Sequence, residues 1–141
     1  MTNATLNERP PQPPFTHADL SQFTGDDLRY SHPLNRKVIY TPGVKYLADR
    51  AHAYWLIDAI ASYFGSTEMN AAIRKDCRLA TLQFWRLEVK DRKAILFANA
   101  DSGEKPFIQQ EIPFTDFPVD HIDIWAGFDR QFWTLYLPSE H

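Results

Sequence analysis

Apolar residues recur at helical spacing between Thr41 and Gly65, the longest regular stretch of the chain. Thr41 can cap the first turn of a helix, Pro42 suits its first position and Gly65 can end it. Steps of three, four and seven place five apolar residues on one face: Tyr46, Ala53, Ile57, Ile60 and Phe64. The pattern therefore predicts one long central helix with a buried second half. A break near Arg50 is the alternative.

Beyond Gly65 the period changes from helical to alternating. Residues 68–75 keep a helical pattern, whereas residues 81–90 alternate as in a half-buried strand. The residues expected on one face of that strand are Gln83, Trp85, Leu87 and Val89. A tight connection at Asp91-Arg92 leads to residues 94–98, and the two strands predict an antiparallel hairpin. Further strands are expected over residues 107–112, 121–125 and 132–137.

Helices come first and strands second, which predicts a single α+β domain over residues 16–141. We expect N-terminal helices, including the long central helix, to pack on a C-terminal, meander-like antiparallel sheet of about four to five strands. A short helix over residues 18–23, capped by Thr16, and a short strand over residues 37–40 precede the long helix. Residues 1–15 carry four prolines and are expected to form a flexible Pro-rich tail.

Composition narrows the class of protein. Aromatic residues make up 14% of the chain, so we expect an aromatic-rich core. The single cysteine, Cys77, excludes an intrachain disulfide and a zinc site with several thiolates, and it fits a reducing cytosol. A net charge of −3 argues against a nucleic-acid binder driven by counterion release. The sequence has no uninterrupted apolar run long enough to span a membrane, so we expect a cytoplasmic protein with no membrane partner.

Acidic residues outnumber basic ones beyond Asn99. Such an excess can attract a basic protein partner, or it can simply keep the protein in solution. On the first interpretation, the partner surface contains four aspartates: Asp116, Asp120, Asp123 and Asp129. A second patch would consist of Phe128, Phe132, Trp133 and Tyr136, although burial of one face of the last strand explains these aromatic residues more simply.

A carboxylate at Asp58 stands on the apolar half of the predicted helix, where it must find a hydrogen-bonding partner. It is either a general base in a pocket beside Trp55 or a structural acceptor. Lys45, Asp49 and His52 share the polar side of the same helix, where an exposed ion pair is the simpler interpretation. The residues that would line a small-ligand or acyl-transfer pocket are Tyr40, Lys45, Asp49, His52, Trp55 and Asp58.

Asp120, His121 and Asp123 carry groups that bind metals. On a strand, His121 and Asp123 share a face and Asp120 points away, so only two ligands come together. A third ligand, His32 or His141, would have to arrive by folding, and we expect no metal site and no cofactor. Cys77 with a histidine would make a thiol nucleophile. No nucleophile motif surrounds it, so a buried, inert thiol is expected.

Three segments together resemble a known family. They are Leu34-Asn35-Arg36, the run Tyr40-Thr41-x-Gly43-Val44-Lys45-Tyr46-Leu47-Ala48-Asp49 with its continuation Ala53-Tyr54-Trp55-Leu56-x-Asp58-Ala59-Ile60-Ala61, and the ending Leu137-Pro138-Ser139-Glu140. With Phe114-Thr115-Asp116-Phe117-Pro118 between them, the chain from about Phe23 onward is similar to an uncharacterised bacterial family of small domains of unknown function, often found on plasmids and phages. The resemblance implies an intracellular accessory protein of mobile DNA, with no known activity, cofactor or catalytic residues to carry over. His52 departs from the family pattern, in which a smaller residue such as glycine is expected.

We therefore expect a non-enzymatic accessory or interaction protein that presents an acidic and aromatic surface to a protein partner. A homodimer is one form that this protein could take. Inhibition of a host defence protein or of a nucleic-acid-handling protein is the specific form of this hypothesis. One alternative is a small enzyme or ligand-binding module with a pocket near the central helix. A direct nucleic-acid binder is the third possibility, and the acidic composition argues against it.

Overall fold

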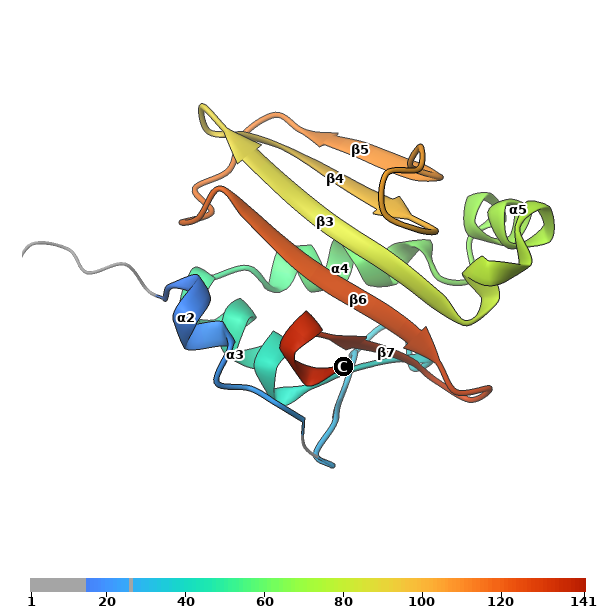
Figure 1. Ribbon diagram of the computed structural model, residues 1–141, viewed down its shortest axis with the longest axis horizontal. Coiled ribbons are helices and arrows are strands. Elements are labelled where there is room, and N and C mark those ends of the chain that lie inside the picture. The colour runs from blue at the N-terminus through green and yellow to red at the C-terminus, as the bar shows by residue number, and fades with distance from the viewer. Residues whose placement is uncertain (1–14, 26) are drawn as a thin grey trace, which may run out of the picture.

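Within residues 15–25 and 27–141, the part of the chain that the computed structural model describes, seven strands form one mixed sheet (Figure 1). The strands are β1 (Tyr30–Ser31), β2 (Val38–Tyr40), β3 (Leu82–Lys90), β4 (Lys93–Asn99), β5 (Ile108–Ile112), β6 (His121–Phe128) and β7 (Trp133–Tyr136). The helices are α2 (His17–Leu20), α3 (Pro42–Ala51), α4 (Tyr54–Tyr63) and α5 (Thr67–Lys75), with 3-10 turns η1 (Cys77–Ala80) and η2 (Pro138–Glu140).

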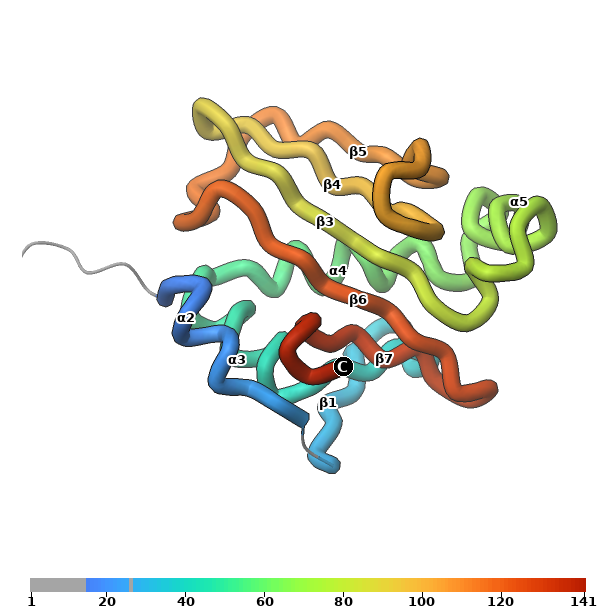
Figure 2. The backbone as a smooth tube through the Cα atoms, viewed as in Figure 1, coloured from blue at the N-terminus to red at the C-terminus, as the bar shows by residue number. Residues whose placement is uncertain are grey.

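The strand order is β1-β2-β7-β6-β3-β4-β5, and β2 and β7 are parallel whereas all other neighbours are antiparallel. The α+β class is confirmed, but the expected antiparallel sheet of four to five strands is wrong. β1 and β2 are too short to show an alternating pattern, and β2 pairs with a strand from the other half of the chain (Figure 2). Because β1 and β2 lie between α2 and α3, the helices do not simply precede the sheet. β6 joins the free side of β3, so the sheet is not a simple meander.

The expected single central helix is also wrong, because the segment forms two helices that are joined at His52. This residue ends α3 in the left-handed conformation, with φ of 52°, and its N–H donates to the carbonyl of Ala48. The hydrogen bond closes the last turn of α3 as a glycine cap would. The alternative of a break near Arg50 was therefore close to the observed position.

The break changes which residues of the second helix face the core. A straight helix would carry the buried stripe of α3 onto Asp58 and Ser62, which lie seven and eleven positions beyond Ala51. After the break, both of these polar residues are exposed, and Ile57 and Ile60 are 2% and 1% exposed. Two short amphipathic helices thus bury apolar side chains that one straight helix would have exposed to water.

Replacing His52 by glycine is expected to raise the free energy of unfolding by about 0.5–1 kcal/mol, because glycine adopts the left-handed conformation without the steric cost of a Cβ. Urea unfolding followed by circular dichroism measures this change. His52→Ala is the matched control, since it removes the ring and keeps the Cβ. Equal stability of the two variants would show that the backbone at this position is not strained.

Side chains of α3 and α4 pack against one face of the sheet and form an aromatic-rich core. The ring of Phe64, at the end of α4, lies 4.5 Å from that of Trp133 in β7. Phe15, the last residue of the predicted tail, is 1% exposed and packs edge-to-face on Phe117. Residues 1–14 of that predicted tail lie outside the described residues. Among the helices described, none combines the length and the apolar character needed to cross a membrane.

The C-terminal turn η2 closes on the start of α3. The carboxylate of Glu140 accepts hydrogen bonds from the Thr41 hydroxyl (2.7 Å), the Leu137 N–H (2.9 Å) and the Gly43 N–H (3.3 Å). Thr41 also caps α3 by accepting from the N–H of Val44. A Cβ on Gly43 would lie 2.6 Å from Oε1 of Glu140, so only glycine leaves room for the carboxylate. Two of the segments that carry the family resemblance therefore meet at one helix terminus.

Candidate functional site

The sheet face opposite α3 and α4 carries a row of aromatic side chains. Phe84 of β3 pairs with Trp125 of β6, which pairs with Tyr136 of β7. The ring centroids are 5.0 Å apart for Phe84 and Trp125 and 6.2 Å apart for Trp125 and Tyr136, both edge-to-face. His141 extends the row, with its Nδ1 2.8 Å from the Tyr136 hydroxyl. We call this surface, turned toward the viewer in Figure 1, the open face; its residues are Phe84, Arg86, Glu88, Ile95, Phe97, His121, Asp123, Trp125 and Tyr136.

A hollow of about 470 Å³ lies over Phe84 and Trp125 of this row. Phe97 and Arg86 line it beside the row, and residues 101–103 and Pro138 form its sides. Nη1 of Arg86 lies 3.1 Å from each carboxylate oxygen of Asp123, and its Nε donates to Glu88 at 2.9 Å. The hollow thus combines an aromatic floor with a guanidinium whose charge is already compensated.

A second hollow of about 870 Å³ shares Arg86 and continues along the same face. Carboxylates outnumber cations over the two hollows together. The acidic lining residues are Glu88, Asp101, Glu111, Asp120 and Asp123, and the basic ones are Arg86, Lys90 and Lys93. The open face therefore offers a ligand apolar contact area within a mildly negative surface.

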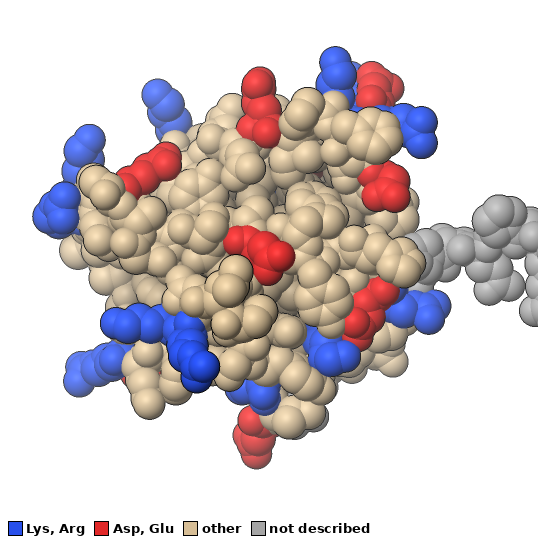
Figure 3. All heavy atoms as spheres, turned by 180° about the vertical axis from the view of Figure 1, so that it is seen from behind, with Lys and Arg blue, Asp and Glu red and all other residues tan. Residues whose placement is uncertain are grey.

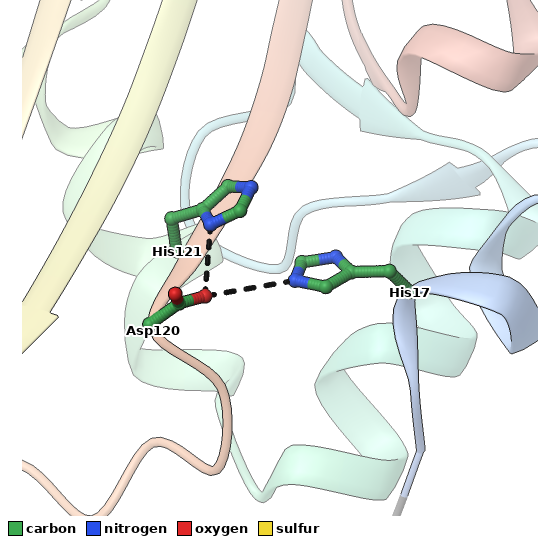
Figure 4. A group of neighbouring side chains, drawn as sticks. All are labelled: His17, Asp120 and His121. Atoms are coloured by element: carbon green, nitrogen blue, oxygen red, sulfur yellow. Dashed lines mark hydrogen bonds and ion pairs between the residues drawn. The ribbon is translucent and has the colours of Figure 1, made fainter.

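Metal-capable side chains gather at one end of the second hollow (Figure 4). Asp120 and His121, from the start of β6, lie beside His17, from the start of α2. The expectation that Asp120 points away from His121 is wrong, since their Oδ1 and Nδ1 atoms are 2.9 Å apart. Asp120 precedes the strand, so strand alternation does not fix its direction.

Three residues of the predicted pocket, Tyr40, Lys45 and Asp49, do come together on the helix side. Lys45 Nζ lies 2.7 Å from the Asp49 carboxylate, which also accepts from the Tyr54 hydroxyl. Tyr40 is buried and stacks on Tyr30, and Lys45 lies over the Tyr30 ring. The hydrogen bond from Tyr54 to Asp49 joins the start of α4 to the last turns of α3 across the break.

Burial and hydrogen bonds shift the pKa values of Asp49, Tyr54 and Tyr40. Hydrogen bonds from Lys45 and then Tyr54 lower the pKa of Asp49, whereas partial burial and the hydrogen bond to Asp49 raise the pKa of Tyr54 to about 12. Burial likewise raises the pKa of Tyr40. The phenols stay protonated near neutral pH, and none of them serves as a base. Acidic and basic side chains lie scattered over this helix side, mostly toward its margin (Figure 3).

The other three residues of the predicted pocket have separate positions. His52 is the left-handed end of α3, and Trp55 packs edge-to-face on Phe117, with ring centroids 6.5 Å apart. Asp58 points toward the loop before β2, where its Oδ1 lies 2.8 Å from Nε2 of His32. The six residues therefore do not line one common pocket in the structure.

Asp58 acts as an acceptor for a buried histidine. His32 is 4% exposed, and its Nδ1 accepts the backbone N–H groups of Leu34 and Asn35. Because Nδ1 accepts, Nε2 carries the ring proton and donates it to Asp58. Asn35 then donates to the carbonyls of Ala61 and Phe64 at the end of α4. The contacts favour the structural interpretation of Asp58.

The four aspartates of the expected partner surface do not share one patch. Asp123 lies on the open face and binds Arg86, whereas Asp120 and Asp129 flank opposite ends of β6. Asp129 accepts from the N–H groups of Gln131 and Phe132 in the β6–β7 turn, and these bonds lower its pKa. Asp116 is exposed in the crossing between β5 and β6.

The aromatic patch expected near the end of the chain is divided between two faces. Trp133 is 8% exposed and stacks on Phe128 at the core, while Tyr136 lies on the open face. Cys77, expected to be buried, is exposed at the start of η1. Phe84 and Trp125 were not expected as site residues. Their outward alternation on β3 and β6 was the available signal.

None of the curated proteins matches the chain. The fold is similar to the crystal structure of a protein of unknown function from Enterococcus faecalis, with 17% identity and a TM-score of 0.47 over 82% of this chain and 93% of that chain. The model of the family of unknown function DUF6876 matches residues 15–141. This match spans nearly the whole chain, and the protein therefore belongs to that family.

Proposed function

We propose that the chain is a non-enzymatic binding module whose open face docks a segment of a protein partner. The observation that carries the proposal is the edge-to-face row of Phe84, Trp125 and Tyr136 on the sheet face opposite α3 and α4, with a hollow of about 470 Å³ over Phe84 and Trp125. Aromatic side chains and arginine are the residue types enriched in protein interfaces, and buried anchors in such hollows supply most of the binding energy.

Charge favours a protein over a nucleic acid as the occupant. Arg86, a cation beside Phe84 and Trp125, is bound by Asp123 and Glu88. A phosphate backbone would have to displace these carboxylates and would also face Asp101. A peptide segment with an aromatic or aliphatic anchor and a flanking lysine or arginine would instead find complementary charge.

The biological setting is part of the same proposal. The resemblance to a plasmid- and phage-associated family supports an accessory protein of bacterial mobile DNA that acts in the cytoplasm. A host defence protein or a nucleic-acid-handling protein is the partner to test first, with inhibition as the expected effect.

Peptides selected from a random display library on the wild-type chain are expected to contain an aromatic anchor and a basic residue. Trp125→Ala and Phe97→Ala should weaken their binding at least tenfold in fluorescence anisotropy, a loss of about 1.4 kcal/mol. Leu34→Ala is the matched control, because Leu34 is 88% exposed and lies in the loop before β2, away from the open face.

Two outcomes would contradict the proposal. Selected peptides that bind both open-face variants as tightly as the wild type would place the binding surface elsewhere. A labelled single-stranded oligonucleotide that binds with a steep salt dependence, and is lost in Trp125→Ala, would make the open face a nucleic-acid site. Sedimentation of the same variants separates self-association from peptide binding.

A further inference from the structure

Two imidazoles and one carboxylate from distant parts of the chain converge at the edge of the open face (Figure 4). One ligand atom from each of His17, Asp120 and His121 lies within 4.8 Å of the other two. Asp120 Oδ1 is 2.9 Å from His121 Nδ1 and 3.8 Å from His17 Nε2. The two rings stack, with centroids 4.6 Å apart and planes at 25°.

We propose that His17, Asp120 and His121 form a binding site for a divalent transition-metal ion of the zinc type. The donor set of two nitrogens and one carboxylate oxygen suits Zn²⁺, Co²⁺ and Ni²⁺, whereas Mg²⁺ and Ca²⁺ prefer oxygen ligands alone. This site does not depend on whether the open face binds a partner.

The observed spacing is close to what such an ion requires. Metal–ligand bonds of about 2.0–2.1 Å in a tetrahedral site place ligand atoms about 3.3 Å apart. The separations of 2.9 and 3.8 Å bracket that value. Small rotations of exposed side chains suffice to close the site, because His17, Asp120 and His121 are 49%, 82% and 35% exposed.

Ion pairing alone gives this exposed arrangement little stability. An exposed histidine–aspartate pair stabilises a protein very little, and one histidine would satisfy the carboxylate. Here two rings stack beside one carboxylate oxygen. A bound ion would take the place of the proton that His121 Nδ1 and Asp120 Oδ1 share in their hydrogen bond.

The fold holds the ligands on well-supported elements. A capping box between Thr16 and Asp19 starts α2, and Leu20 anchors the helix in the core. His121 is the first residue of β6, where it pairs with Glu88 of β3. Asp123, next on the same face of β6, is bound by Arg86 and is not counted as a ligand.

Three protein ligands leave coordination positions for water or for an atom of a bound partner. Asp120 and His121 also line the hollow of about 870 Å³. The ion would therefore lie where the open face begins and would join α2 to β6. Its binding is expected to raise the thermal midpoint, because only the folded chain brings the three ligands together.

Titration of the untagged full chain with Zn²⁺ is the direct test, and one ion per chain is expected by calorimetry. The variants His17→Gln, Asp120→Asn and His121→Gln should each weaken binding at least tenfold. His52→Gln is the matched control and should bind as the wild type does. Zn²⁺ bound equally well by the His17 and His121 variants would overturn the site.

A measurement without mutation guards against variants that fold poorly. Co²⁺ added to the wild-type chain should broaden the ring signals of His17 and His121 in nuclear magnetic resonance spectra, and those of His32 and His52 should remain sharp. Mg²⁺ at the same concentration should change none of them. Broadening centred on other histidines, or no broadening at millimolar Co²⁺, would also overturn the proposal.

Discussion

Replacing Trp85 by alanine is expected to lower the free energy of unfolding by about 3–5 kcal/mol. Trp85 is 1% exposed, and its ring lies 5.5 Å from Tyr63 and 6.2 Å from Phe64 at the end of α4. Its indole N–H donates to Oε1 of Gln83 at 3.1 Å, and Gln83 donates to the carbonyl of Leu79 at 2.9 Å. Alanine would leave a cavity between sheet and helix and a buried amide oxygen without its donor.

Urea unfolding of two companion variants separates these contributions. Trp85→Phe keeps most of the ring volume and removes the N–H, so it should cost about 1–3 kcal/mol. Trp125→Ala removes the same side chain from the open face of the adjacent strand and should cost less than half as much as Trp85→Ala. Equal costs for Trp85→Ala and Trp125→Ala would contradict the assignment of the two sheet faces.

Replacing Glu140 by alanine is expected to lower the free energy of unfolding by about 2–3 kcal/mol. The carboxylate accepts from the Thr41 hydroxyl and from the N–H of Gly43 at the start of α3, where the helix dipole also favours a negative charge. Thermal or urea unfolding measures the loss. Glu111→Ala, which removes an exposed carboxylate on β5, should stay within about 0.5 kcal/mol of the wild type.

A double-mutant cycle tests whether position 43 requires glycine because a side chain there would clash with the Glu140 carboxylate. Gly43→Ala should displace Glu140, because the new Cβ would lie 2.6 Å from its Oε1 and 2.8 Å from Cδ1 of Leu137. In the Glu140→Ala background, the same change should cost clearly less. Additive costs would show that the glycine is needed for another reason.

The sequence predicted local elements well and long-range pairing poorly. Alternation over β3 identified Gln83, Trp85 and Leu87 as one face, and all three are buried. The parallel pairing of β2 with β7 could not be predicted from the sequence, because the pattern of a three-residue strand is too short to assign a neighbouring strand.

The sequence contained a signal for the helix break. Apolar residues from Tyr46 to Phe64 could be placed on one stripe only by accepting Asp58 at the depth of the core. The structure resolves this conflict by shifting the phase at His52, after which Asp58 meets solvent and His32. A polar residue that contradicts a helical pattern was thus a sign of the interruption.

The candidate site was only partly predictable for the same reason. Phe84 and Arg86 alternate with the predicted face of Gln83, Trp85 and Leu87, but which strands flank them depends on tertiary pairing. His121 and Asp120 were recognised as metal-capable, whereas His17 reaches them only because α2 packs beside β6. Contacts between residues far apart in sequence have no periodic signature.

The position of β7 between β2 and β6 has a kinetic consequence. The hairpins β3–β4 and β4–β5 close short loops and can form early, whereas β2 and β7 close a loop that contains most of the domain. The entropy of closing that loop slows the joining of residues 38–44 to residues 133–140. Folding is therefore expected to end with this union, and the polypeptide remains an incomplete sheet with an exposed β6 edge until it occurs.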